Sequence, residues 1–158
     1  MLVPKIILDT STLVAGILSP RDNSPSRLLL QAWRAARVCV VVTEDIELEY
    51  RSHLLANERI GGATWAQKVL DVLAAHDVRT ERVAYEGAAA GSGRIVPFLA
   101  SRARSPDTGD QMFLDLAASL GDEIAAVIAE DRGHLLSLDQ VAERPVLPAR
   151  VFVMRYVR

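Results

Sequence analysis

The chain contains almost no cysteine. Only Cys39 is present among 158 residues, and it lies inside the apolar run 38–42. A single thiol can build neither a disulfide framework nor a zinc site that depends on several thiolates. The sequence therefore predicts a protein of a reducing compartment, and we expect a cytoplasmic location.

Long apolar segments are also missing. The apolar stretch Ile6–Leu8 near the N-terminus ends at Asp9, and no small-residue cleavage pattern follows it. No segment approaches the roughly 20 apolar residues that a membrane-spanning helix needs. We therefore expect a soluble, unprocessed protein with no membrane partner.

A surplus of basic residues is absent as well. The formal net charge is -2, whereas proteins that bind nucleic acid usually carry an excess of cations that neutralises phosphates. Any binding of nucleic acid must therefore depend on a local group of cations and not on the overall charge.

What the chain does have is enough apolar material for one full core. Half of its residues are hydrophobic, and 158 residues is the length of one domain rather than two. We expect residues 1–158 to form a single domain.

Apolar, β-branched segments alternate with segments of helical periodicity. Strands are predicted at Val3–Leu8, Val38–Val42, Val78–Ala84, Ile124–Ala129 and Val151–Met154. Helices are predicted at Pro25–Ala36, after Thr43 through Glu49, at Thr64–Ala75, from Asp107 to Leu120 and at Leu135–Val141. A loop should follow the first strand, residues 86–104 have the weakest pattern, and Pro145 and Pro148 indicate another loop. Alternation of this kind is typical of an α/β fold with a mostly parallel sheet covered by helices on both faces.

Two carboxylates follow predicted strands directly. Asp9 comes after the first strand and Asp131 after the strand that ends at Ala129. In open α/β sheets ligands bind beyond the carboxyl ends of the strands, so both residues are candidates for a functional site. An aspartate at such a place is also a common turn or helix-capping residue, and each residue alone fits that reading as well.

Further acids lie on two predicted helices. Asp107 and Asp110 stand at a helix start, where backbone N–H groups and the helix dipole favour carboxylates. Glu49 lies between Ile46 and Tyr50 at helical spacing, near the buried margin, although its local pattern alone indicates a solvated residue.

Taken in order, four segments resemble the acidic motifs of PIN domains. They are Lys5-Ile-Ile-Leu-Asp9-Thr-Ser11-Thr-Leu-Val14, Thr43-Glu-Asp-Ile-Glu-Leu-Glu49-Tyr50, Asp107-Thr-Gly-Asp110-Gln-Met-Phe-Leu114 and Ala129-Glu-Asp131. The resemblance covers nearly the whole chain and is closest to the toxins of toxin–antitoxin systems, the VapC-like ribonucleases. It implies a PIN-like three-layer α/β/α fold with a mostly parallel central sheet.

The same resemblance implies roles for individual residues. The metal-site carboxylates would be Asp9, Glu49, Asp110 and Asp131; Ser11 would support the site, and Asp107 would be a helix cap or auxiliary acid. The sequence departs from the family pattern at Ala129, where a threonine often stands, at Gly133, and in the apparent insertion at 86–104.

Oxygen ligands without histidine or cysteine suit Mg²⁺ or Mn²⁺ rather than zinc. Such an ion can activate water and neutralise charge on a phosphate undergoing displacement. The resulting prediction is a metal-dependent endoribonuclease that cleaves single-stranded regions of RNA, as the toxin of a type II toxin–antitoxin system. The implied partners are RNA, a cognate antitoxin and a second copy of the chain in a homodimer.

Basic residues that flank the predicted site are the candidates for RNA contacts: Arg21, Arg51, Arg102, Arg104 and Arg132. We assign no catalytic role to His53 or His134. Trp33 and Trp65 lie on apolar helical stripes and are candidates for packing against a second copy.

Two other functions remain open from the sequence. The first is a PIN-like module without catalysis that binds RNA or protein, and Ala129 is the departure that favours it. The second is a phosphatase of the haloacid dehalogenase type, because Asp9 follows the first strand; the segment Thr10-Ser11-Thr12 lacks the second aspartate of that family.

Overall fold

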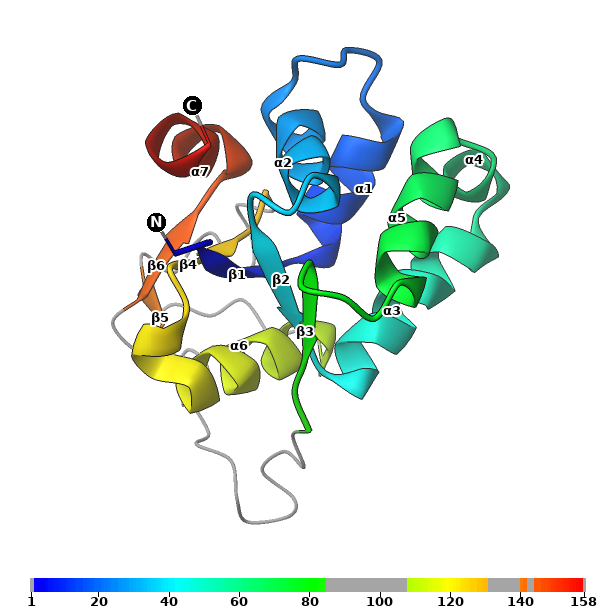
Figure 1. Ribbon diagram of the computed structural model, residues 1–158. Helices are drawn as coiled ribbons and strands as arrows, with labels where there is room; N and C mark the ends of the chain where they lie inside the picture. The colour runs from blue at the N-terminus through cyan, green and yellow to red at the C-terminus, as the bar shows by residue number, and fades with distance from the viewer. Residues whose placement is uncertain (1, 85–107, 131–139, 142–143, 158) are drawn as a thin grey trace.

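The chain forms a three-layer α/β structure around one sheet (Figure 1). This computed structural model describes residues 2–84, 108–130, 140–141 and 144–157, with side chains left undescribed at 108–111 and 141. The strands are β1 Lys5–Leu8, β2 Cys39–Val42, β3 Thr80–Arg82, β4 Ala126–Ile128, β5 Gln140–Val141 and β6 Arg144–Leu147. The helices are α1 Thr10–Leu18, α2 Pro25–Arg34, α3 Glu44–Ala56, α4 Glu58–Gly61, α5 Thr64–Ala74, α6 Thr108–Leu120 and α7 Ala149–Tyr156, with a 3₁₀ turn η2 at Gly121–Glu123.

The strand order is β3-β2-β1-β4-β6-β5. All neighbouring pairs from β3 to β6 are parallel, and only β5 runs antiparallel, against β6. The central strands are apolar on both faces, since every residue of β2 and β4 is buried. Such strands need helices on both sides. In Figure 1, α1, α2 and α7 lie above the sheet and α6 lies below it, which confirms the predicted PIN-like layered architecture.

Two helix starts formed as the sequence predicted. The Ser24 side chain accepts a hydrogen bond from the backbone N–H of Arg27, with Pro25 at the first helical position of α2. The Thr43 hydroxyl accepts one from the N–H of Ile46, 3.2 Å away, at the start of α3. These bonds satisfy backbone donors that have no partner within the helix, so the caps fix where the helices begin.

The predicted loop after β1 is wrong, because α1 begins at Thr10 directly after Asp9. The β-branched residues of this segment lower its intrinsic helix propensity. Packing against α2 outweighs that preference. Gly16 allows the close approach: a Cβ added there would lie 2.6 Å from a methyl carbon of Leu30.

The C-terminal predictions also need correction. Residues 144–147, expected in a loop, form β6, and Pro145 is accommodated because the β4 pairing involves only Val146 and Leu147. Residues 140 and 141, expected at the end of a helix, form β5; residues 135–139 lie outside the described part.

The expected last strand 151–154 is part of α7. Ala149, Phe152 and Val153 are buried there at spacings of three and four residues, which is the helical pattern. The neighbouring valines favour a strand locally, but the buried face of the helix decides the conformation.

Trp33 cannot serve as an interface residue. Its side chain is 1% exposed within the core, and its indole N–H donates to the carbonyl of Arg79 at 3.0 Å. Trp65 is partly buried and packs at the margin of the core. Over the described parts of the chain, no helix is long and apolar enough to cross a membrane.

Candidate functional site

Asp9 lies at the carboxyl edge of the sheet, where β1 ends. Its backbone N–H donates to the carbonyl of Ile128 at 2.8 Å, so the ends of β1 and β4 are joined there. The residue is 5% exposed. Asp9 occupies the N-cap position of α1 and its carbonyl accepts from the N–H of Leu13 at 3.2 Å, but its side chain makes no capping hydrogen bond to the helix.

Ser11 connects Asp9 to the end of β4. Its hydroxyl donates to Oδ2 of Asp9 at 2.6 Å and accepts from the backbone N–H of Glu130 at 3.3 Å. The Glu130 carboxylate accepts from the N–H of Ala149 at 2.7 Å, at the start of α7. Ser11 therefore has the supporting position beside Asp9 that was predicted for it, while Glu130 is occupied in holding α7.

Glu49 approaches the same edge through its neighbour Tyr50. Tyr50 is fully buried and its hydroxyl donates to the carbonyl of Leu8, the last residue of β1. Burial first, and then the negative charges of Asp9 and Glu49, raise the pKa of Tyr50 well above its usual value. Desolvation is the largest cause of this shift, and the charge of Asp9 contributes more than that of Glu49.

Glu49 itself is accessible from solvent. Its side chain is 33% exposed, and Oε1 lies 3.0 Å from Nε2 of His53 one helical turn later. An ion or a substrate in solvent can therefore reach the Glu49 carboxylate.

The remaining predicted ligands are less completely placed. Asp110 belongs to the first turn of α6, a helix that contacts α3, but its side chain is not described. Asp107 and Asp131 lie outside the described residues. Among the side chains that are described, no three of His, Cys, Asp and Glu are grouped to hold a metal ion. The full carboxylate set therefore stays a prediction, of which the structure places Asp9 and Glu49.

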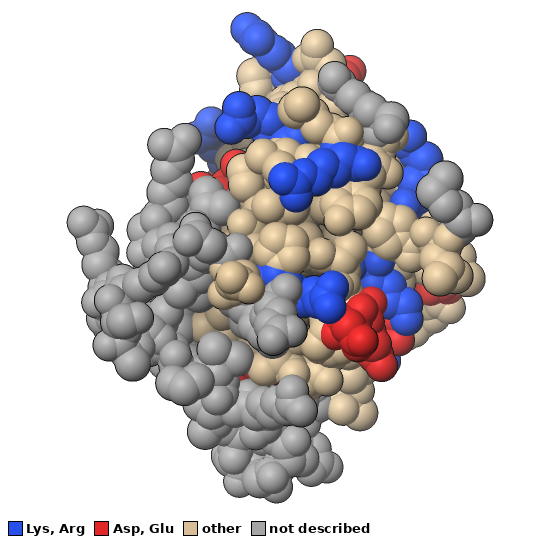
Figure 2. Space-filling model, turned by 90° about the vertical axis from the view of Figure 1, so that its left-hand side faces the viewer, with Lys and Arg blue, Asp and Glu red and all other residues tan. Residues whose placement is uncertain are grey.

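The predicted RNA-contacting arginines have mixed positions. Arg21 is exposed in the loop that follows α1, not in a loop directly after β1. Arg51 donates to Glu47 Oε1 at 3.1 Å. Arg102, Arg104 and Arg132 lie outside the described residues. On the side that carries α7 and β6, Figure 2 shows Lys and Arg in separate groups among uncharged side chains, with one acidic cluster.

Glu47 holds two arginines in place on the outer side of α3. Its carboxylate is 18% exposed and accepts from Nε of Arg82 on β3 at 3.2 Å as well as from Arg51. Burial raises the pKa of Glu47, but the hydrogen bonds of Arg82 and Arg51 outweigh burial, and the net pKa is lowered from 4.5.

Replacing Glu47 with glutamine is expected to lower the free energy of unfolding by about 1 kcal/mol at neutral pH. A folded pKa below the unfolded one gives stability that is present above the unfolded carboxyl range and is lost as the pH falls through the folded pKa. Urea denaturation of the parent and the variant between neutral and acid pH should show the difference vanishing in acid. Asp45→Asn, an exposed change on the same helix, is the control; a constant difference at every pH would contradict the ion pair.

Tyr50 was not among the predicted site residues. The signal that could have identified it is its spacing of four residues from Ile46, which puts both residues on one face of a helix. Tyr50→Phe should cost about 1–3 kcal/mol, because the buried carbonyl of Leu8 loses its side-chain donor. Tyr156→Phe, at a residue that is 45% exposed, should be neutral. Chemical denaturation compares the two, and equal stability of both variants would show that the phenol bond does not hold α3 to β1.

Comparison with known proteins agrees with this geometry. A family model described as "PIN domain" matches residues 5–133, which includes all four predicted metal-site acids. No curated protein and no solved structure matches the chain.

Proposed function

The chain belongs to the PIN domain family, a family of nucleases that use divalent metal ions, and from this we propose that it is an Mg²⁺- or Mn²⁺-dependent endoribonuclease. Its substrate would be single-stranded regions of RNA. Its biological role would be that of the toxin in a type II toxin–antitoxin pair. The observation that carries the proposal is Asp9 at the carboxyl end of β1, with Ser11 hydrogen-bonded to it and with the helix of Glu49 bonded through Tyr50 to the last residue of β1.

The described side chains fit a hard divalent cation. Asp9 and Glu49 offer carboxylate oxygens, and the hydrogen bond from Ser11 to Oδ2 orients the Asp9 carboxylate within a nearly closed environment. Oxygen donors of this kind suit Mg²⁺ and Mn²⁺. Asp110 and Asp131 would complete the set, as the resemblance to the family implies. A bound ion of this class lowers the pKa of water and offsets charge on a phosphate.

The chain's own residues set the geometry of that site. Ser11 ties Asp9 to the end of β4, and Tyr50 ties the Glu49 helix to the end of β1. Asp9 and the helix that carries Glu49 are therefore each bonded to the end of a central strand. Fixed positions are what an in-line displacement at phosphorus requires.

Single-stranded RNA is the substrate that fits best. Asp9 is only 5% exposed, so a phosphodiester must bend closely into the edge of the sheet to reach it. Unpaired nucleotides can do so, whereas a stiff duplex cannot.

The proposal includes a cognate antitoxin and a second copy of the chain as protein partners. Leu48 and Leu55 stand seven residues apart on α3 and are 57% and 76% exposed. Exposed leucines at this spacing provide apolar area of the kind that protein interfaces bury. Light scattering that gives a monomer at all practical concentrations would reject the homodimer.

A cleavage assay tests the enzyme directly. Unstructured RNA is incubated with the protein in Mn²⁺ and in EDTA, and an identically purified Asp9→Asn variant measures contaminating nuclease. Cleavage that requires both the ion and Asp9 is expected. Equal cleavage in EDTA and in Mn²⁺, with contamination excluded, would refute the proposal.

The same assay decides the second candidate, a PIN-like binding module without catalysis. Ala129 favours that alternative, because it is fully buried next to the site, where a threonine often stands in the family and would add a hydroxyl. The phosphatase reading has no support from the family match.

Metal binding should also appear in stability. An ion that binds only the folded carboxylates stabilises the fold by about 2.7 kcal/mol at a hundred times its dissociation constant. The melting temperature of the parent should therefore rise when Mn²⁺ replaces EDTA, and that of Asp110→Asn should rise less. An equal rise in both would show that Asp110 is not a ligand of the bound metal.

A further inference from the structure

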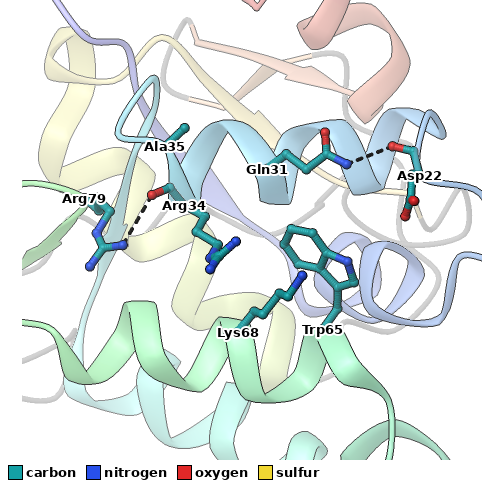
Figure 3. Close-up of a pocket in the computed structure, with 7 residues that line it drawn as sticks. All are labelled: Asp22, Gln31, Arg34, Ala35, Trp65, Lys68 and Arg79. Carbon is teal, nitrogen blue, oxygen red and sulfur yellow. Dashed lines mark hydrogen bonds between the residues drawn. The ribbon is translucent and has the colours of Figure 1, made fainter.

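A polar pocket lies between α2 and α5, and neither Asp9 nor Glu49 lines it. Its volume is about 550 Å³, within the range of known ligand sites. The lining residues are Asp22, Gln31, Arg34, Ala35, Trp65, Lys68 and Arg79, all drawn in Figure 3. Cations outnumber anions in this list, and an aromatic ring forms one wall.

Two of the cations have no carboxylate partner among the described residues. Arg79 is neutralised by Asp77, which accepts from its Nη2 at 2.6 Å, and Asp22 is paired with Arg27 at 2.7 Å. Arg34 and Lys68 make no such ion pair within the described chain. The pocket therefore carries two uncompensated positive charges.

These charges point into the pocket beside the indole of Trp65. Figure 3 shows the guanidinium of Arg34 directed from α2 toward α5, and the ammonium of Lys68 directed from α5 toward the ring. Nζ of Lys68 lies over the ring of Trp65, 4.5 Å from its centroid, so a base that stacks on this face takes the place of the ammonium as Lys68 turns to a phosphate. The Arg27 guanidinium, in a residue that is 6% exposed, lies 5.0 Å from the same ring and supports it from within.

The pocket lies at a distance from Asp9. Arg34 ends α2 before the amino end of β2, and Arg79 directly precedes β3, whereas Asp9 follows the carboxyl end of β1. Because these strands are parallel, Arg34 and Arg79 lie near the amino ends of the strands and Asp9 at the carboxyl end, and a strand of four residues spans roughly 13 Å.

We propose that this pocket binds single-stranded RNA, with a base against Trp65 and phosphates on Arg34 and Lys68. An aromatic wall with adjacent free cations is the combination that holds an unpaired nucleotide without regard to sequence. That the bound RNA is also the substrate of the enzyme rests on the proposed ribonuclease function. The pocket would hold the RNA outside the cleavage site and so lengthen the contact of a long substrate with the enzyme.

The test compares two charge-reversed double variants. Arg34→Glu with Lys68→Glu changes the pocket, and Arg59→Glu with Arg150→Glu changes exposed residues elsewhere by the same net charge. Affinity is measured by fluorescence anisotropy in EDTA on an unstructured RNA of about 20 nucleotides, longer than the 4–16 nucleotides that single-strand-binding folds cover. The pocket variant should bind about tenfold more weakly or worse than the control, and its salt slope should fall by about 1.4, the value for two phosphates.

Separate readouts keep this inference distinct from the proposed function. Cleavage of a dinucleotide, too short to reach the pocket, should be unchanged in the pocket variant. If the pocket variant binds the long RNA as tightly as the control, the pocket inference is overturned even where the parent cleaves RNA. If the pocket variant loses affinity but the parent cleaves nothing, the RNA site stands and the ribonuclease proposal fails.

Tryptophan emission and an acidic competitor identify the occupant. Trp33 is buried, so RNA that contacts Trp65 should quench the emission of the parent and not that of Trp65→Phe. Absence of quenching at saturating RNA would contradict the base contact. If polyglutamate binds the parent more tightly than the pocket variant, and RNA binds both equally, the pocket would be assigned to an acidic protein partner. That result would overturn the proposal.

Discussion

Replacing Asp9 with asparagine is expected to reduce RNA cleavage by about 10²-fold or more, with no loss of folded protein. Groups that only orient a metal ligand typically cost 10–100-fold when they are removed, so loss of a direct ligand charge should cost at least as much. Asparagine keeps the volume of the side chain and removes its charge. The expected loss therefore reports on ion binding and charge stabilisation, not on packing.

The fold should survive because asparagine keeps the size of the side chain and can still accept the hydrogen bond of Ser11. An amide oxygen can still accept from the Ser11 hydroxyl, which lies 2.6 Å from Oδ2 in the parent, and α1 receives no side-chain cap from Asp9. Asp122→Asn is the matched control, since this exposed aspartate precedes β4 at the opposite edge of the sheet. Initial cleavage rates and circular dichroism are compared for all three proteins. Full activity in Asp9→Asn would move the active site away from the end of β1.

The parts of the fold that could be predicted from sequence are those with one dominant local signal. β2 is an uninterrupted apolar, β-branched run, and such a run has few alternatives to a buried strand. Two helix starts are set by hydrogen bonds made within four residues. The first has Ser24 followed by Pro25, and the second has Thr43 followed by acidic residues. Sequence was therefore sufficient to predict an element wherever the contact that stabilises it is made by residues close in the chain.

The predictions failed where a distant contact outweighs the local preference. The first turn of α1 has two threonines and reads as a loop, yet Leu13 and Ile17 are buried against the rest of the core. Val151 and Val153 favour a strand, but the face that includes Phe152 packs as a helix. Periodicity over only eight residues is too short a window to distinguish these outcomes without knowing the packing partner.

At the candidate site, residue types could be predicted from the sequence, but the contacts between them could not. Asp9 was predicted because it follows a strand, and only the structure shows that Ser11 joins it to Glu130, which follows the neighbouring strand β4. The link between α3 and β1 through Tyr50 spans 42 residues and has no local signature. Family resemblance carried Glu49 into the predicted set, because its own surroundings in sequence suggest an ordinary solvated glutamate.

Replacing Trp33 with alanine is expected to lower the free energy of unfolding by about 3–5 kcal/mol, a large part of the total stability of a small domain. The indole is 1% exposed, so the change leaves a cavity in the core. It also removes the N–H that donates to the Arg79 carbonyl at 3.0 Å, in the segment that leads into β3. Urea unfolding monitored by circular dichroism measures the loss.

Two further variants separate the causes of that loss. Trp33→Phe keeps most of the apolar ring but has no donor for Arg79, and should cost less than the alanine change, with about 1 kcal/mol of its loss due to the hydrogen bond. Trp65→Ala should cost less than Trp33→Ala, because Trp65 lies at the margin of the core. If Trp33→Ala costs no more than Trp65→Ala, the indole of Trp33 does not stabilise the core as its burial implies. A larger loss of stability in Trp33→Ala than in Trp65→Ala would instead show that Trp33 stabilises the packing of α2 against the segment leading into β3. Trp65 is then the tryptophan available to a ligand.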